Sequence, residues 1–379
     1  MIIIKRFVED TIINLLGSNK VILVLGTRRV GKTFLISSIQ KQYSGNFISL
    51  NGEDFDVQAI LKNRSISNYK RLVGDYKLVF IDEAQAIQDV GMSLKLMIDS
   101  NPELTIIATG SSSLDLMNKS GEPLTGRHFQ INLYPFSQIE LSKNENLLET
   151  KQHLDERLIY GSYPEIINLK TYSEKSAYLL LLVQSYLLKD IITYAGIKYS
   201  DKIVNLLRLI AYQVGSEVSY HELGTQLGLT RATVENYLDL LCKVFILYKL
   251  PSYSSNQRKE VTKSCKWYFF DNGIRNAIIN DFRAPELRND VGTLWENYIL
   301  SERIKRNHYL GEIKQLYFWR NYNQQEVDLI ELKDGHIAAF EFKYTLNKKV
   351  KLPNSFATSY PDSSFECIHK DNYLDFITT

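Results

Sequence analysis

Short runs rich in apolar residues alternate with segments of helical spacing over the first 140 residues of the chain. The runs at 21–25, 46–50, 77–81 and 104–109 predict strands that are buried on both faces, as in a parallel sheet. Apolar residues recur at helical spacing over 5–16, and a second helix is predicted to begin at residue 34. This alternation predicts an α/β domain over residues 1–140.

The pattern becomes helical after residue 140. Three segments have a helical period, namely 153–160, 172–194 and 201–213. They predict a helical layer over residues 141–212. The last segment, 290–379, begins with a helix near residue 292. Its strands are expected at 316–320, 326–331 and 336–342, with a turn at 333–335.

Length and charge limit the choice of partners only weakly. A chain of 379 residues predicts two or three domains. Its 45 Lys and Arg residues against 43 Asp and Glu residues leave a net charge of +2. Bulk charge therefore neither favours nor excludes nucleic acid, and any basic binding surface must be local.

The cysteines and the apolar segments predict a cytoplasmic protein without a membrane span. Cys242, Cys265 and Cys367 are far apart and odd in number, which argues against a disulfide framework or a zinc site. The apolar part of the N-terminus is too short for a signal peptide. The most apolar helical stretch, 177–188, is shorter than the roughly 20 residues that a membrane span requires.

Residues 26–33 read Gly-Thr-Arg-Arg-Val-Gly-Lys-Thr between a predicted strand and a predicted helix. This is a phosphate-binding loop in the context that it requires. Lys32 would reach the β- and γ-phosphates of ATP, and Thr33 would hold Mg²⁺. The expected nucleotide-binding residues are Gly26, Thr27, Arg28, Arg29, Val30, Gly31, Lys32, Thr33, Phe34, Asp82 and Ser111.

The strand at 77–81 delivers Asp82 and Glu83 to the carboxyl edge of the sheet, where open α/β sheets bind ligands. Asp82 would hold Mg²⁺ directly or through water. Glu83 would polarise the attacking water as a general base. A phosphate-binding loop together with these two carboxylates indicates a hydrolase.

Two further polar groups are candidates for contact with the γ-phosphate. The strand at 104–109 ends in hydroxyl residues, and either Thr109 or Ser111 could sense the phosphate; a polar turn or helix cap is an equal alternative. Arg127 is the one arginine between Arg71 and Arg157. It could stabilise transition-state charge in cis or from a neighbouring subunit, or it could be a surface arginine.

These motifs resemble a large family of prokaryotic AAA-type ATPases with a C-terminal domain of unknown function. The resemblance rests on 26–33, 81–85, 109–112 and 126–127. Tyr134-Pro135-Phe136 with Glu140, and the stretch 160–165, match as well, so it spans essentially the whole chain. It implies a P-loop NTPase parallel-sheet domain, then a helical and winged-helix region, then a small α/β domain similar to restriction endonucleases.

Residues 213–289 contain a helix-turn-helix pattern. Ser219 and Glu222 predict a capping box, Gly228 lies in the turn, and Thr230 can cap the second helix. If this module reads DNA, the exposed residues of its second helix would be Thr230, Arg231, Thr233 and Asn236.

A two-stranded wing is predicted from the runs at 245–251 and 266–270. The stretch 249–266 holds five cations against one acid, Glu260; they are Lys249, Arg258, Lys259, Lys263 and Lys266. It could contact phosphates. Packing between domains is the alternative role, and the acids Glu235 and Asp239 on the second helix would repel DNA.

The last segment carries Asp328 on one strand and Glu341-Phe342-Lys343 on the next, an order that resembles nucleases named for an Asp…(Asp/Glu)-x-Lys motif. Asp328 and Glu341 could share Mg²⁺. Lys343 projects from the same strand face as Glu341 and could orient water, and Glu296 could complete the site. Alternating solvated charges on a hairpin would explain the same pattern.

Three functions stay open from the sequence. The favoured one is an Mg²⁺-dependent ATPase whose distal domains act on DNA or on a protein partner. A nucleotide-dependent switch with negligible turnover and a degenerate C-terminal domain is the second. An ATP-regulated, metal-dependent DNA nuclease is the third, and each could act as a homo-oligomer.

Overall fold

The computed structural model describes residues 3–111, 124–187, 200–254, 265–346 and 348–379. Within them the chain forms two compact units. The N-terminal unit consists of Ile3–Tyr134 together with Lys243–Phe245. The C-terminal unit consists of Pro135–Cys242 and Ile246–Thr379. The predicted division of the chain at residues 140, 212 and 289 stays a prediction.

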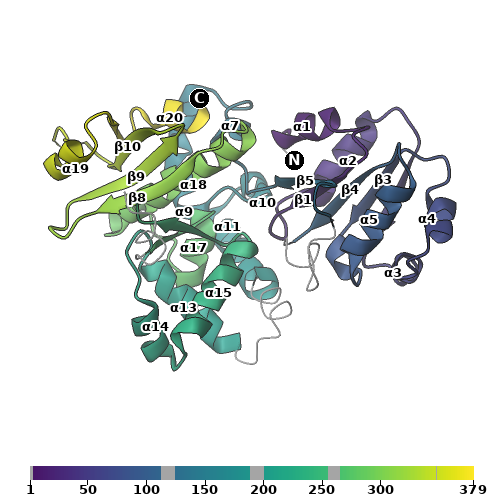
Figure 1. Cartoon of the computed structure of the whole chain (residues 1–379). Coiled ribbons are helices and arrows are strands. Elements are labelled where there is room, and N and C mark those ends of the chain that lie inside the picture. Colours follow the sequence, from purple (N-terminus) through teal and green to yellow (C-terminus); the bar gives the residue numbers. More distant parts are fainter. Residues whose placement is uncertain (1–2, 112–123, 188–199, 255–264, 347) are drawn as a thin grey trace. The chain divides into compact units, whose positions relative to one another are not determined.

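A parallel five-stranded sheet is the centre of the N-terminal unit (Figure 1). Its strands are β1 (Val21–Leu25), β2 (Phe47–Asn51), β3 (Leu78–Asp82), β4 (Thr105–Gly110) and β5 (His128–Asn132), in the order β2-β3-β4-β1-β5. The four predicted strands are confirmed. The fifth, β5, was not predicted, because its sequence His-Phe-Gln-Ile-Asn is only half apolar.

Helices cover this sheet. They are α1 (Val8–Asn14), α2 (Lys32–Gln42), α3 (Phe55–Lys62), α4 (Ile66–Val73), the short η1 (Ala84–Ala86) and α5 (Val90–Ser100). Leu61, Tyr69 and Met97 from α3, α4 and α5 join the strands in one hydrophobic core. The burial of β1, β3 and β4 on both faces is what their continuous apolar sequences require.

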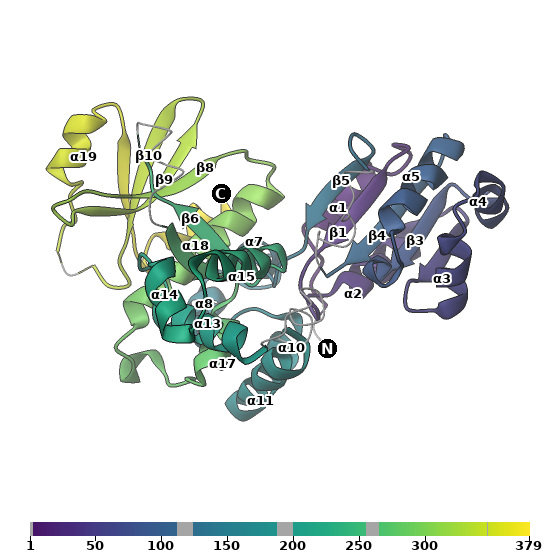
Figure 2. The same ribbon diagram turned by 60° about the horizontal axis from the view of Figure 1, so that its bottom comes forward.

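The C-terminal unit begins with a helical part (Figure 2). Its helices are α7 (Gln138–Leu141), α8 (Leu147–Gln152), α9 (Leu154–Tyr160), α10 (Pro164–Asn168), α11 (Tyr172–Leu182), α13 (Ser200–Tyr212), α14 (Tyr220–Leu227), α15 (Arg231–Lys243) and α17 (Asn272–Ile279). The helices predicted at 153–160 and 201–213 are confirmed. The helix predicted over 172–194 continues from α11 into a π-helical turn, Val183–Leu187, and residues 188–194 lie outside the described residues.

Two sheets complete this unit. Strands β6 (Leu247–Pro251) and β7 (Cys265–Phe269) pair antiparallel. The second sheet has the order β11-β10-β9-β8 and consists of β8 (Gln315–Arg320), β9 (Glu326–Lys333), β10 (His336–Phe342) and β11 (Ser364–Ile368). Its helices are α18 (Val291–Tyr309), α19 (Asn354–Ser359) and α20 (Tyr373–Thr378). The predicted turn between β9 and β10 is confirmed, with positive φ at Asp334 and Gly335 as a tight hairpin requires.

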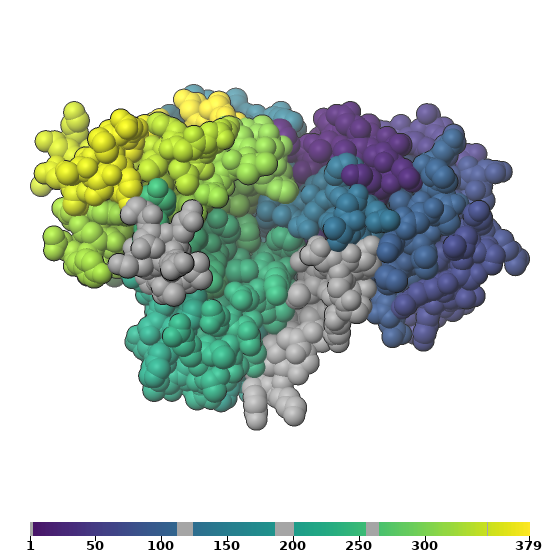
Figure 3. Space-filling model, in the orientation of Figure 1, coloured from purple at the N-terminus to yellow at the C-terminus, as the bar shows by residue number. Residues whose placement is uncertain are grey.

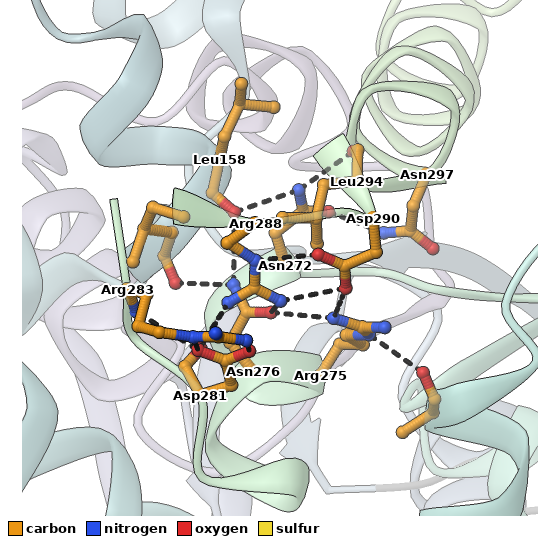
Figure 4. Close-up of polar contacts among 12 residues, drawn as sticks. Leu158, Asn272, Arg275, Asn276, Asp281, Arg283, Arg288, Asp290, Leu294 and Asn297 are labelled. Carbon is orange, nitrogen blue, oxygen red and sulfur yellow. Dashed lines mark hydrogen bonds and ion pairs between the residues drawn. The ribbon is translucent and has the colours of Figure 1, made fainter. Parts of the chain in front are cut away.

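A buried network of amides and ion pairs joins the helical part to α18 and to the residues just before it (Figure 4). Asn297 of α18 accepts from the N–H of Phe269 at 2.7 Å and donates to its carbonyl at 3.0 Å. Its amide also donates to Asn272 of α17 at 2.6 Å. Arg275 and Arg288 both pair with Asp290 just before α18. On the face drawn in the space-filling view, the teal and green helical segment lies directly below the lime and yellow C-terminal segment (Figure 3).

The motif stretches at 134–140 and 160–165 have structural roles in this unit. Gly161 has φ +69°, and a Cβ there would lie 2.0 Å from the Asp271 carboxylate, which accepts from the N–H of Ser162 at 2.7 Å. Glu140 is fully buried and forms a capping box with Ser137 at the start of α7. The first stretch therefore caps the start of α7, and the second fixes the turn at Gly161 against Asp271.

The cysteines and the helices bear on disulfides and membrane spans. Cys242, Cys265 and Cys367 all belong to the described residues, and no disulfide joins them. In the part of the chain that the structure describes, no helix combines the length and apolar character that crossing a membrane requires.

Candidate functional site

The loop at 26–33 runs from the carboxyl end of β1 into the first turn of α2. Gly31 precedes α2 with φ +100°, a conformation that favours glycine. A Cβ on Gly26 would lie 2.2 Å from the carbonyl oxygen of Leu133. Backbone geometry therefore requires both glycines of the motif, and the N-terminus of α2 gives the loop the positive potential that favours phosphate.

Lys32 is 5% exposed, and its ammonium group lies over the loop backbone. It donates to the carbonyl of Gly26 at 2.9 Å and to that of Thr27 at 3.0 Å. The phosphate-binding role of Lys32 stays a prediction.

Arg6, just before α1, supports the loop from outside the motif. Its buried guanidinium donates to the carbonyl of Val30 at 2.9 Å and to that of Tyr134 at 2.5 Å. Sequence analysis missed Arg6 because a single arginine ahead of a helix has no local pattern that reveals a contact 24 residues away.

The two nucleotide motifs meet at Asp82. The hydroxyl of Thr33 donates to Asp82 Oδ2 at 2.8 Å, and the hydroxyl of Thr109 donates to Asp82 Oδ1 at 2.5 Å. Strand β4 lies between β1 and β3, so Thr109 stands between the motifs as expected for a sensing residue. A hydroxyl and a carboxylate side by side form a hard oxygen donor set that fits Mg²⁺.

Glu83 is held in an unusual backbone conformation, with φ +51°. Its N–H donates to the hydroxyl of Thr109 at 3.0 Å. Its carboxylate accepts a short hydrogen bond from the amide of Gln85. A Cβ on Gly52 would lie 2.4 Å from the carbonyl oxygen of Glu83, so the end of β2 also fixes this turn. Positive φ in a residue with a Cβ costs free energy, which the surrounding contacts must offset.

The other expected residues of the N-terminal unit are placed unequally. Ser111 is buried directly after β4, and Phe34 is 43% exposed in the first turn of α2. The carbonyl of Arg127 accepts from the N–H of Val21, the first residue of β1, so Arg127 lies at the amino end of the sheet. Its guanidinium donates to Asp99 at 2.6 Å.

The expectation that Arg127 acts in cis conflicts with this placement. The loop lies at the opposite end of β1, and a strand of that length spans about 16 Å. A contact with the phosphates of a neighbouring subunit stays a prediction.

The structure brings together the four expected residues of the C-terminal domain. Leu329 pairs with Phe340 across β9 and β10, which puts Asp328 beside Glu341. The N–H of Phe342 donates to Asp328 at 2.8 Å, and the ammonium of Lys343 donates to Glu341 at 2.6 Å. From α18, Glu296 lies within electrostatic range of Asp328.

Two residues of β7 enter the same cluster. The hydroxyl of Tyr268 donates to Glu296 at 2.6 Å. The ammonium of Lys266 lies 3.4 Å from Glu296 and donates a short hydrogen bond to Glu326 at the start of β9. Lys266 is 2% exposed, so its predicted place on a phosphate-contacting surface is wrong. The predicted cations at 258, 259 and 263 lie outside the described residues.

Burial and neighbouring charges shift the pKa values of Asp328 and Lys266 in this cluster. Burial raises the pKa of Asp328 well above its ordinary value, and Glu296 and Glu341 raise it further. Burial lowers the pKa of Lys266, but the surrounding carboxylates raise it by more, so the net shift is upward. Lys266 therefore carries a positive charge at neutral pH.

The cluster offers no three-ligand metal site in this arrangement. Among the described residues, no three His, Cys, Asp or Glu side chains are placed to hold one metal ion. The carboxylates face the ammonium groups of Lys266 and Lys343.

The helix-turn-helix candidates lie around the start of α15. Thr230, Arg231 and Asn236 are exposed, and Thr233 is half-buried. The N–H of Thr233 donates to the hydroxyl of Thr230 at 3.1 Å, so Thr230 caps α15 as predicted. Ser219 accepts from the N–H of Glu222 at 3.3 Å. Contact of these residues with DNA stays a prediction.

Comparison with protein families divides the chain into three parts. Residues 18–142 match the model of an AAA domain. Residues 151–284 match a domain of unknown function, DUF8612, and residues 291–372 match another, DUF4143. With the parallel sheet and the loop, the first match gives the N-terminal unit the features of an AAA-type P-loop domain.

Two relatives that match most of the chain are described as uncharacterized proteins. An uncharacterized protein of Haemophilus influenzae is 25% identical over 387 residues, covering 94% of this chain and 88% of that protein. An uncharacterized protein of Mycobacterium tuberculosis is 25% identical, covering 91% of this chain and 75% of its own length.

Solved structures resemble the chain only distantly. A Walker-type ATPase of Pyrococcus abyssi has a TM-score of 0.46 and 16% identity, covering 73% of this chain and 96% of that one. The Holliday junction branch migration motor RuvB of Thermotoga maritima has a TM-score of 0.30 and 16% identity, covering 65% and 90%.

Proposed function

We propose that this protein binds ATP with Mg²⁺ and hydrolyses it. The observation that carries the proposal is the contact between Thr33 and Asp82, because it joins the phosphate loop to the acidic strand end. Lys32 would bind the phosphates, and Glu83, next to Asp82, would activate water. Mg²⁺, held by Thr33 and Asp82, would neutralise phosphate charge.

Steady-state phosphate release tests this function. Wild type should release phosphate from ATP at a rate that falls by roughly 10²-fold or more in Glu83→Gln, the lower end of general-base catalysis. Lys32→Ala should also abolish turnover, while Lys41→Ala, an exposed lysine at the end of the same helix, should leave it unchanged. Equal rates in wild type and Glu83→Gln would instead favour a switch that binds ATP and turns over rarely.

The C-terminal unit is proposed to couple the nucleotide state to DNA or to a protein partner. Exposed Arg231 and Asn236 at the start of α15 support contact with DNA through a winged-helix module. A salt titration of DNA binding tests it, since affinity through phosphate contacts must fall as salt rises. DNA binding that does not weaken as salt rises would contradict phosphate contacts. The absence of DNA binding would favour a protein partner.

A nuclease is the second candidate, because Asp328, Glu341 and Lys343 lie together at the end of neighbouring strands. It requires a divalent metal, for which the described residues of the cluster offer no set of three acidic, His or Cys ligands. Plasmid DNA incubated with Mg²⁺ or Mn²⁺ tests it. Cutting that is lost in Asp328→Ala and Lys343→Ala would establish this activity, and uncut DNA would favour a domain used for binding.

A further inference from the structure

Lys266 lies at the centre of the carboxylate cluster although it comes from a different part of the fold. It belongs to β7, all of whose residues are buried. Its ammonium contacts Glu326 of β9 and Glu296 of α18. The ring of Phe318 on β8 lies below it, 5.3 Å from the ammonium to the ring centroid. One side chain of β7 thus contacts α18 and two strands of the C-terminal sheet.

The carboxylates around Lys266 need a cation. Glu296, Glu326 and Asp328 all lie within electrostatic range of its ammonium. Asp328 is 8% exposed, and a buried carboxylate without an opposite charge is strongly disfavoured. Arg320 lies 3.6 Å from Glu326 at the rim, and Lys343 contacts Glu341. Among the described residues, Lys266 is the cation that forms ion pairs with both Glu296 and Glu326.

We propose that Lys266 is the resident cation of this cluster, taking the place that a divalent metal would hold, and that it excludes such a metal from Asp328 and Glu341. Its ion pairs direct the carboxylates of Glu296 and Glu326 toward the ammonium of the chain. Among the described residues, no three acidic, His or Cys side chains are placed to hold one metal ion. The cluster then acts as a charged joint between β7 and the C-terminal sheet. This inference does not depend on ATP hydrolysis.

Mn²⁺ binding to the full chain without nucleotide tests the proposal, measured from the signal of free Mn²⁺ in electron paramagnetic resonance. Lys266→Met removes the charge but keeps a long side chain against Phe318, and Lys266→Arg keeps the charge. Adding Asp328→Asn to each protein isolates the binding that this site contributes.

Wild type and Lys266→Arg should show no Mn²⁺ binding that depends on Asp328. Lys266→Met should bind Mn²⁺ at least about tenfold tighter at this site, because a unit charge a few ångströms away changes ion affinity by more than that. Equal Asp328-dependent affinity in wild type and Lys266→Met would overturn the proposal. So would the absence of Mn²⁺ binding in both.

A second variant covers the case in which Lys266→Met does not fold. Lys266→Met/Glu326→Gln removes the closest acid with the lysine, keeps the net charge and leaves Glu296, Asp328 and Glu341 in place. Mn²⁺ should raise the unfolding temperature of this variant and leave that of wild type unchanged. No response of the variant to Mn²⁺, or an equal response in wild type, would contradict the inference.

Discussion

The hydroxyl of Thr33 donates a 2.8 Å hydrogen bond to the carboxylate of Asp82, although the two residues are 49 positions apart in the sequence. Thr33 lies in the first turn of α2, and Asp82 is the last residue of β3. Their contact puts a hydroxyl and a carboxylate side by side, where they would hold Mg²⁺. The candidate nucleotide site is therefore assembled by the fold of the N-terminal unit.

Substitution at Asp82 should separate metal-dependent turnover from folding. Asp82→Asn keeps the shape of the side chain but removes the negative charge that would hold Mg²⁺. We expect phosphate release to fall by at least about tenfold and to need more Mg²⁺, while the unfolding temperature changes little. A Mg²⁺ titration of the rate measures this. Asp54→Asn, at the N-cap of α3, is a matched control, because Asp54 caps a helix and should affect stability only.

A negative charge at position 85 should change the pH dependence of turnover. Its amide donates to the carboxylate of Glu83, so Gln85→Glu puts a second carboxylate against the first. Like charges at contact raise the pKa of one partner. The acid limb of the pH–rate profile should then move to higher pH by about one unit, and activity at pH 6–7 should fall.

The same charge change at exposed Gln88 serves as the control for this effect. Gln88→Glu should leave the profile in place. An unmoved acid limb in Gln85→Glu would mean that Gln85 does not contact Glu83 during turnover.

Arg6 should be required for a stable phosphate loop. Arg6→Ala leaves the buried carbonyls of Val30 and Tyr134 without this donor, and losing a charged hydrogen bond costs about 1.5–3 kcal/mol. We expect a lower unfolding temperature and weaker ATP binding, followed by calorimetry. Lys5→Ala, which removes an exposed lysine paired with Asp10, should change neither. Unaltered ATP affinity in Arg6→Ala would remove Arg6 from the support of the loop.

The ion pairs of Asp281 should stabilise the protein at neutral pH, and acid should remove this contribution. Hydrogen bonds from Arg283 lower the pKa of Asp281 to about 2, and Arg288 contributes to the same shift. A folded-state pKa below the unfolded value stabilises the protein above the unfolded pKa, and this is lost as pH falls from about 4 to about 2. Asp281→Asn should therefore lower stability near pH 7 by about 1 kcal/mol, since exposed Arg283 is screened by solvent.

Chemical unfolding at several pH values measures this contribution. The difference between Asp281→Asn and wild type should shrink toward pH 2. A constant difference over this range would show that the carboxylate acts through shape instead of charge.

The parts predicted correctly from the sequence are those encoded locally. The strand at 21–25, the loop after it and the acidic strand end at 82–83 are each recognisable within a few residues. Lys266 was misplaced because a lysine in a strand usually faces solvent, and its carboxylate partners lie 30 and 60 positions away. Arg6 was missed as a supporting residue for a similar reason, since its partners Val30 and Tyr134 lie 24 and 128 positions away.

The amide of Asn297 satisfies both backbone groups of Phe269 and also reaches Asn272. These contacts cross the boundary between the two family matches, which end at 284 and begin at 291. A chimaera that combined residues 151–284 of this chain with the last domain of a distant relative would need an amide at the same place on α18. The two modules are therefore expected to be inherited as a pair, and to evolve by matched changes on both sides of this junction.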